Sequence, residues 1–224
     1  MDTSRSSLNI ASILESFSNQ EFDILIGTQM VAKGLDFPNA TLVGIINADL
    51  GLYIPDFRAT EKVFQLIYQA SGRSGRSSKE GEVVIQTYSP NSSIIENAKS
   101  LNISKFYEEE LLKREELNYP PYSWLAKVEF LGPNKFKIFS LIEEVKYSLK
   151  DKYIGLDILG PAPCFLEKLK NNYRFQLVFK SKKSYDPNGS LLHAFIRKNF
   201  KVYENKKPLR QNRINIYFDP ITLI

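Results

Sequence analysis

The sequence predicts an α/β lobe followed by a smaller α+β domain, and three observations support this fold class. Over residues 1–117, short apolar runs alternate with segments of helical periodicity, which is typical of a sheet flanked by helices. Pro120 and Pro121 then interrupt the chain, and a residue before proline is pushed out of the helical region. Over residues 118–224 the expected order is strand, helix, strand, strand, helix, strand, which is the order of a split βαβ sandwich. We therefore expect two domains, 1–117 and 118–224.

The first domain opens on an amphipathic helix. Its apolar residues follow the i, i+3, i+4, i+7 pattern and are Ile10, Ile13, Leu14 and Phe17. Two unbroken apolar runs, 22–26 and 42–46, predict short parallel strands that are buried under helices on both faces. A helix over 61–70, an alternating strand over 82–87 and two helices over 94–117 follow. The lobe is therefore predicted to lack its opening strands.

The second domain is predicted from apolar alternation and from two further helical patterns. Its expected elements are, in order, a strand over 124–131, a helix over 138–149, strands over 154–159 and 174–180, a helix over 191–196 and a strand over 214–218.

Charge and cysteine content restrict the possible functions. Residues 1–115 hold 11 Lys and Arg against 15 Asp and Glu, whereas residues 116–224 hold 19 against 10. A basic second half favours a nucleic-acid partner, although a solvated lysine-rich face is the alternative. The single cysteine, Cys164, excludes a disulfide framework and a Cys cluster for zinc, and we expect it to be a small buried hydrophobe. The only histidine, His193, is expected to be a packed or surface residue.

A glycine–arginine repeat is the most informative stretch. Gln69 precedes Gly72, Arg73, Gly75 and Arg76, so that two arginines stand three positions apart between glycines. Arginine stabilises the charge on a transferring phosphoryl group, and glycine allows the backbone to approach a ligand closely. A helix C-terminus also favours basic residues and glycine, but it explains only one arginine and one glycine.

A second loop follows the first apolar run. It places Thr28, Gln29, Lys33, Gly34 and Asp36 after a predicted strand, where α/β sheets bind ligands. An ordinary turn, in which the glycine supplies a positive φ, is the alternative for this loop alone. Together the two loops resemble motifs V and VI of superfamily 2 helicases, which belong to the second RecA-like lobe.

This resemblance implies a role for each residue. Arg73 and Arg76 would reach the γ-phosphate bound on a first lobe, and Gln69 would orient the nucleotide or the attacking water. Gly72 and Gly75 would lie at the nucleotide, as would the stretch from Gly34 to Asp36. Thr28, Gln29 and Lys33 would face the DNA backbone or couple the two sites.

Further segments narrow the resemblance to one family. They are Gly27–Gly34, Asn47–Asp49, Pro55–Ala59, Tyr119–Tyr122, Leu159–Pro163, Asn172–Leu177 and Phe218–Pro220. In this order and spacing they are similar to the PriA family of primosomal replication-restart helicases, from about the first residue of the chain to the last. We therefore expect an incomplete RecA-like second lobe followed by the family's C-terminal domain.

The family resemblance also implies an activity and partners. It implies the C-terminal part of an ATP-dependent 3′–5′ DNA helicase that acts in replication restart and primosome assembly in the bacterial cytoplasm. The implied partners are branched forks and single strands of DNA, primosome proteins and the single-stranded DNA-binding protein. ATP and magnesium would be bound mainly by a first lobe that precedes this chain, and zinc by a Cys-rich module that also precedes it.

The 224 residues contain no Gly-x-x-x-x-Gly-Lys-Ser/Thr loop, which would cradle the phosphates of a nucleotide. We therefore expect this chain to be inactive as an ATPase in isolation. A non-enzymatic module for DNA binding or primosome docking, from a truncated gene, is the alternative. Another superfamily 2 helicase is disfavoured by Tyr119–Tyr122 and Leu159–Pro163.

Basic residues in the second domain are the remaining candidates for DNA contact. They gather around the strand that begins near Tyr173 and are Lys168, Lys170, Arg174, Lys180, Lys182 and Lys183. Tyr122, Trp124 and Tyr173 are candidates for stacking on unpaired bases, but core packing is the alternative and is favoured for Trp124.

Overall fold

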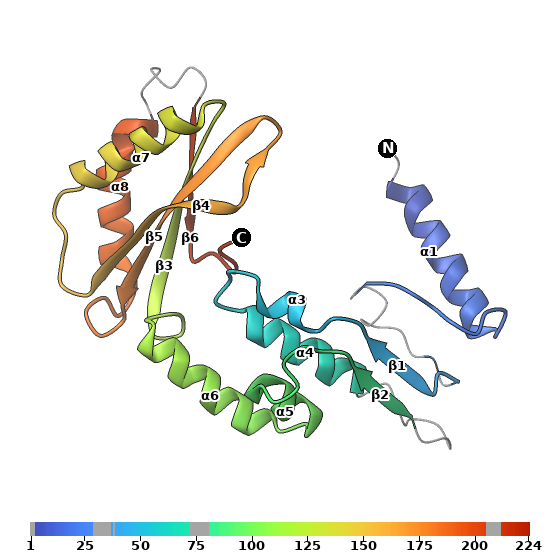
Figure 1. Cartoon of the computed structure of the whole chain (residues 1–224). Helices are drawn as coiled ribbons and strands as arrows, with labels where there is room; N and C mark the ends of the chain where they lie inside the picture. The colour runs from blue at the N-terminus through green and yellow to red at the C-terminus, as the bar shows by residue number, and fades with distance from the viewer. Residues whose placement is uncertain (1–2, 29–36, 38, 72–80, 205–211) are drawn as a thin grey trace. The chain divides into compact units, whose positions relative to one another are not determined.

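The computed structural model of the chain describes residues 3–28, 37, 39–71, 81–204 and 212–224 (Figure 1). Its helices are α1 (Thr3–Ser18), α3 (Asp49–Leu52), α4 (Ala59–Ser71), α5 (Ser93–Lys99), α6 (Ile103–Glu116), α7 (Lys135–Ser148) and α8 (Ser190–Glu204). Its strands are β1 (Leu42–Ile45), β2 (Glu82–Ile85), β3 (Ser123–Gly132), β4 (Leu156–Leu169), β5 (Asn172–Lys182) and β6 (Arg213–Phe218). The chain divides into two compact units, one within 1–54 and 59–106 and the other within 55–58 and 107–224.

The first unit is built on a small parallel sheet. β1 pairs with β2 in parallel, with Val43 opposite Val83, and α3 and α4 connect the two strands. A parallel pair needs such a crossover, and the helix that provides it packs back on the sheet. Val63, Phe64 and Ile67 of α4 are buried in this core, as the helical periodicity predicted.

Two expectations for this unit are wrong. Residues 22–26 are not a strand, and Phe22, Ile24 and Ile26 are exposed. A strand needs a hydrogen-bonded neighbour, and among the described residues the sheet of this unit contains only β1 and β2. The sheet is also not buried on both faces, since every second residue of β1 and β2 faces solvent.

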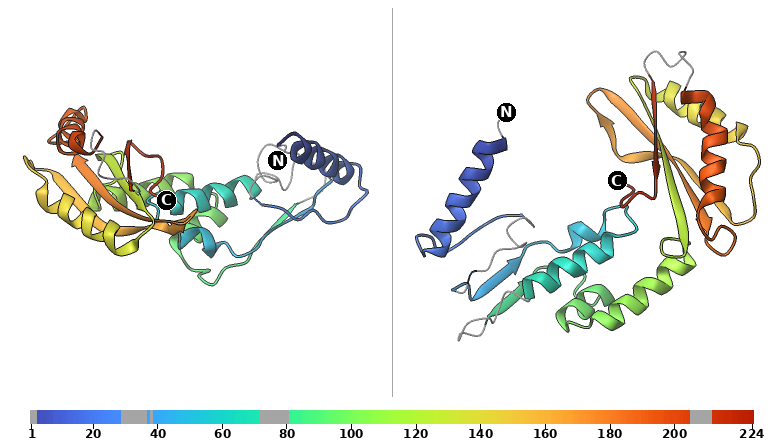
Figure 2. Two further views of the ribbon diagram at one scale, coloured as in Figure 1. Left: turned by 90° about the horizontal axis from the view of Figure 1, so that it is seen from above. Right: turned by 180° about the vertical axis from the view of Figure 1, so that it is seen from behind.

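The second unit has the order of elements that the sequence predicts. Its sheet is ordered β4-β5-β3-β6, and all three neighbouring pairs are antiparallel. α7 and α8 lie on the same face of this sheet (Figures 1 and 2). Between them and the sheet, Phe130, Phe179 and Phe200 are fully buried and meet edge to face. Trp124 packs against this core, as we favoured.

β4 extends much further than the predicted strand over 154–159. It continues to Leu169 and turns into β5 through Lys170 and Asn171, whose φ angles are 47° and 64°. Two consecutive residues with positive φ match the twist of a two-residue hairpin loop. The pairing of β4 with β5 is irregular, with register shifts between Leu159 and Ala162 and between Pro163 and Lys168.

Two helices precede the second sheet, as predicted for 94–117. α5 begins at an N-cap in which the Ser92 hydroxyl accepts a hydrogen bond from the Ile95 amide, and α6 ends at Glu116. The chain passes from the first compact unit to the second within α6, between residues 106 and 107. The domain boundary between 117 and 118 remains a prediction from the sequence.

Candidate functional site

Most of the predicted nucleotide site lies outside the described residues. This applies to both arginines, Arg73 and Arg76, and to the glycines and polar residues predicted beside them, Gly34, Asp36, Gly72 and Gly75. Of the DNA-facing candidates in the same lobe, Gln29 and Lys33 also lie outside, and Thr28 is an exposed residue that belongs to no helix or strand.

Gln69 is the one predicted catalytic residue that the structure describes. It lies in the last turn of α4, on the opposite face from Val63 and Ile67, and is exposed. The helix ends two residues later at Ser71, whose hydroxyl donates to the Ile67 carbonyl over 3.0 Å. The buried face of α4 therefore holds the helix against the core, and the Gln69 side chain lies exposed on the other face.

Asp49 organises the end of the parallel sheet. Its carboxylate accepts hydrogen bonds from the Thr87 hydroxyl (2.9 Å) and the Tyr88 amide (2.8 Å), and the residue is buried. The Tyr88 amide is the main cause that holds the pKa of Asp49 below its usual value. Asp49 therefore connects the start of α3 to the turn after β2.

The apolar and aromatic sequence of residues 50–57 predicts a loop that either contacts DNA or has a structural role. In the structure, residues 55–58 belong to the second unit, where the Thr222 hydroxyl donates to Asp56 and the Phe57 ring stacks on Tyr119 with the ring centroids 5.2 Å apart. The Arg114 guanidinium lies 5.5 Å from the Phe57 ring centroid. These contacts favour a structural role for the segment.

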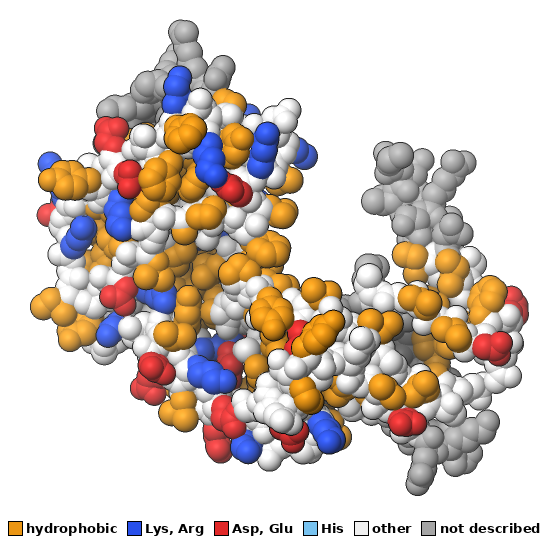
Figure 3. All heavy atoms as spheres, viewed as in Figure 1, with side chains coloured by type: hydrophobic (Ala, Val, Ile, Leu, Met, Phe, Trp, Pro, Cys, Tyr) orange, Lys and Arg blue, Asp and Glu red, His pale blue; other side chains and the backbone are white. Residues whose placement is uncertain are grey.

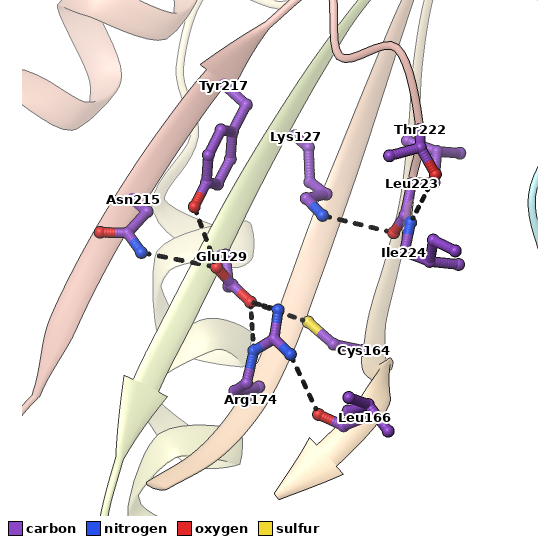
Figure 4. Close-up of polar contacts among 10 residues, drawn as sticks. All are labelled: Lys127, Glu129, Cys164, Leu166, Arg174, Asn215, Tyr217, Thr222, Leu223 and Ile224. Carbon is purple, nitrogen blue, oxygen red and sulfur yellow. Dashed lines mark hydrogen bonds and ion pairs between the residues drawn. The ribbon is translucent and has the colours of Figure 1, made fainter. Parts of the chain in front are cut away.

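A buried polar cluster lies on the sheet face opposite α7 and α8 (Figure 4). At its centre is Glu129, which is only 2% exposed. Nε and Nη2 of Arg174 both donate to Glu129 Oε1, at 2.6 and 2.5 Å. The Cys164 thiol lies 3.5 Å from the same oxygen, and Asn215 and Tyr217 reach the other oxygen. The carboxylate is thus paired and hydrogen-bonded, as a buried charge requires.

Arg174, which we predicted as a DNA contact, therefore donates mainly to Glu129 and also through Nη1 to the Leu166 carbonyl (3.4 Å). Sequence reasoning missed this cluster. A signal was present, because Lys127 and Glu129 are charged residues in an otherwise apolar strand and project from the same face. Lys127 is also buried, and its Nζ donates to the Leu223 carbonyl over 3.3 Å.

Cys164 is buried, as predicted. Burial and the neighbouring Glu129 raise the pKa of its thiol to about 12. Among the described residues no three His, Cys, Asp or Glu side chains are grouped to hold a metal ion. None of the helices in the described ranges has the length and apolar character of a membrane span.

The six basic residues around β5 do not form one patch. Lys168, Lys170 and Arg174 lie at its hairpin end, and at about 3.3 Å per residue the other end of the strand is roughly 30 Å away. At that end Lys180 is buried, and its Nζ donates to the Leu117 carbonyl over 2.8 Å and lies 3.5 Å from the Tyr119 ring centroid.

Burial lowers the pKa of Lys180. The prediction that the six basic residues around β5 gather in one surface cluster is wrong, because an extended strand separates side chains that are close in sequence. Lys183 at the same end lies 4.2 Å from the Trp124 ring.

Lys168 and Lys170 are exposed at the β4–β5 hairpin. The Lys168 ammonium is 5.1 Å from the Tyr173 ring centroid. Glu167 of the same hairpin pairs with Lys135 at the start of α7 over 2.5 Å, and this hydrogen bond raises the pKa of Lys135. The hairpin end of β5 therefore presents exposed basic side chains beside exposed apolar ones.

Comparisons with known proteins cover nearly the whole chain. Residues 1–78 match the family described as the helicase conserved C-terminal domain, and residues 115–221 match the family described as the primosomal protein N C-terminal domain. Three relatives, all described as replication restart protein PriA, are similar to the chain. The protein of Bacillus subtilis is 42% identical over 92% of the chain, that of Borreliella burgdorferi 39% over 96%, and that of Chlamydia muridarum 42% over 87%. The chain spans 25%, 32% and 26% of the length of these relatives, respectively.

Proposed function

The chain belongs to the PriA family of replication restart proteins, and from this premise we propose that it acts as part of an ATP-dependent 3′–5′ DNA helicase. The activity would serve replication restart and primosome assembly in the bacterial cytoplasm. One observation carries the proposal: the helicase C-terminal match over 1–78 and the primosomal match over 115–221 occur in this order on one chain.

The helicase lobe would supply the residues that act on the transition state of ATP hydrolysis. Arg73 and Arg76 are the proposed donors to the γ-phosphoryl group, because their charge is permanent and their donors lie in a planar fork. Gln69 would orient the nucleotide or the attacking water. The glycines of the repeat and the loop from Gly34 to Asp36 would bind the nucleotide.

ATP and magnesium would be held mainly by another lobe of the complete protein. The nucleotide supplies the phosphoryl group, and the residues of this chain stabilise the charge that develops on it. Zinc would be held by a Cys-rich module elsewhere in the complete protein, since this chain has a single cysteine, Cys164, and it is buried.

The second unit would hold DNA, as branched forks or single strands. The basic excess of residues 116–224 supports this, since lysine and arginine neutralise phosphates and release counterions. Lys168 and Lys170 are the proposed phosphate contacts, and Arg174 would act at the same hairpin, although its guanidinium already pairs with Glu129. In the first lobe Thr28, Gln29 and Lys33 would face the DNA backbone. Primosome proteins and the single-stranded DNA-binding protein are the proposed protein partners.

The test is ATP turnover by the complete protein, with and without DNA, for the wild type, Arg76→Ala and Arg197→Ala. Arg197 is exposed on α8 and is the control for loss of one surface arginine. We expect Arg76→Ala to lower kcat by about 10³-fold or more while KM changes little, because the arginine acts on charge that develops only in the transition state.

A variant with normal kcat and a raised KM would contradict the assigned role. The 224-residue chain by itself should show no DNA-stimulated ATPase activity, and turnover by this chain that disappears in Arg76→Ala would contradict that part of the proposal.

A further inference from the structure

One end of the second unit combines exposed apolar and basic side chains. We call it the tip surface and define it by Lys135, Phe136, Lys137, Phe165, Leu166, Lys168, Leu169 and Lys170. The first three residues come from the first turn of α7 and the others from the β4–β5 hairpin. The Lys135–Glu167 ion pair joins the two elements. Figure 3 shows hydrophobic and basic side chains interleaved over the part of this unit that carries the hairpin.

The apolar members of the tip surface are unusually exposed. Phe136 is 82% exposed, Phe165 52%, Leu166 53% and Leu169 46%. Single exposed apolar residues are common on proteins, but a group of them at one end of a unit indicates a binding surface.

The hairpin holds Phe165 and Leu166 outward by its backbone geometry. Pro163 pairs with Phe175 and Lys168 with Tyr173, so residues 164–167 lie opposite Arg174 alone and leave the regular ladder. Such a bulge redirects the side chains that it carries.

The polar cluster around Glu129 contacts this bulge at two points and so holds it against the sheet. The Cys164 thiol contacts the Glu129 carboxylate, and Arg174 Nη1 donates to the Leu166 carbonyl while Nε and Nη2 hold Glu129. The bulge is therefore fastened to the sheet on either side of Phe165. A braced backbone loses little conformational entropy when the side chains that it presents bind a ligand.

The charges of the tip surface indicate which class of partner it binds. Four lysines belong to the tip surface, and the two acids in contact with its elements are both paired, Glu167 with Lys135 and Glu129 with Arg174. Lysines beside exposed aromatic and aliphatic side chains suit a polyanion that also presents flat apolar faces, which is a nucleic acid with unstacked bases.

We propose that the tip surface binds DNA at unpaired or terminal bases, with Phe165 and Leu166 against a base face and Lys168 and Lys170 on the adjacent phosphates. The proposal deepens the DNA binding proposed above and rests on it. In this arrangement Arg174 is a positioning residue that keeps the bulge in shape, rather than a phosphate contact.

The experiment uses the full 224-residue chain and fluorescence anisotropy with three labelled probes: an oligo-dT single strand, a forked duplex and a blunt duplex. The variants are Phe165→Ala, the double variant Lys168→Gln/Lys170→Gln, and Tyr147→Ala. Tyr147 is 94% exposed on α7 outside the tip surface and is the matched control for loss of a surface aromatic. Unfolding curves from Trp124 fluorescence establish that each variant is folded, since exposed substitutions shift stability little.

We expect Phe165→Ala to weaken binding of the single strand and the fork about tenfold, with the salt dependence unchanged, because the lost contact is stacking. The double lysine variant should instead reduce the slope of log K against log salt by about 1.4 on the single strand, for two phosphates lost. Tyr147→Ala should bind like the wild type, and the blunt duplex should bind more weakly than the fork.

Two outcomes would overturn the proposal, and they are distinguishable. If the wild-type chain binds DNA and both tip variants bind equally well, DNA lies elsewhere on the chain and the proposed function survives. If the wild-type chain binds none of the three probes at low salt, the proposal for the tip surface fails together with the DNA-binding part of the proposed function.

Discussion

Replacing Arg174 by alanine gives the sharpest test of how the second unit is built. The substitution removes the ion-pair partner of Glu129, a residue that is 2% exposed. Removing one partner of a buried ion pair costs about 3–5 kcal/mol, because the remaining charge stays desolvated. The Arg174 side chain is 15% exposed, so water can reach part of the vacated space.

Two hydrogen bonds to the carboxylate also survive the substitution. Asn215 and Tyr217 still reach Oε2, each at 3.4 Å. Because of these donors and the partial access of water, we expect the free energy of unfolding to fall by about 2–4 kcal/mol, which is somewhat less than the full cost of breaking a buried pair.

The assay is urea unfolding of the 224-residue chain followed by tryptophan fluorescence. Trp124 is the only tryptophan and packs against the core of the second unit, so the signal reports this unit. The control is Arg197→Ala, which replaces an exposed arginine of α8 and should change the free energy of unfolding by less than about 0.5 kcal/mol.

A double-mutant cycle isolates the pair from the rest of the cluster. Glu129→Gln removes the charge that Arg174→Ala leaves unpaired, so the double variant should lose less stability than the sum of the two single variants. A loss below about 0.5 kcal/mol for Arg174→Ala, or strict additivity in the cycle, would show that the guanidinium does not stabilise Glu129 in solution.

Two further predictions concern residues whose ionisation the fold changes. Cys164 is buried and its thiol has a pKa of about 12, so nearly all of it is protonated at pH 8. A disulfide reagent such as dithionitrobenzoate should therefore label the folded chain slowly and the chain in 8 M urea rapidly, and equal rates would contradict the burial. Lys180→Ala removes the donor to the Leu117 carbonyl and the cation over the Tyr119 ring, so it should lower the free energy of unfolding by about 1–2 kcal/mol. It should leave DNA affinity unchanged, and a loss of affinity at unchanged stability would place Lys180 at a DNA site instead.

The local sequence pattern predicted most elements of the second unit. Ile138, Ile142 and Val145 recur with helical spacing and are all fully buried in α7, and Phe175, Leu177 and Phe179 alternate inward from β5. These predictions succeed because the period of a helix or a strand is set within a few residues of chain and needs no distant partner.

Predictions that depended on distant partners were less successful. Residues 22–26 have the composition of a buried strand, yet Ile24 and Ile26 are exposed, because a strand is stable only beside a paired neighbour. The four-residue helix α3 was also missed, since a single helical turn has little stability of its own and α3 packs against α4.

The sequence by itself determined the family, the order of strands and helices in the second unit, and the glycine–arginine repeat on which the proposed role of Arg76 rests. Only the tertiary structure decided what the charged residues of the second unit contact. Arg174 pairs with Glu129, 45 residues away in sequence, because the two strands lie side by side in antiparallel register. Lys180 is buried for the same kind of reason: its environment is set by the neighbours that packing supplies, and these are not encoded in the residues beside it.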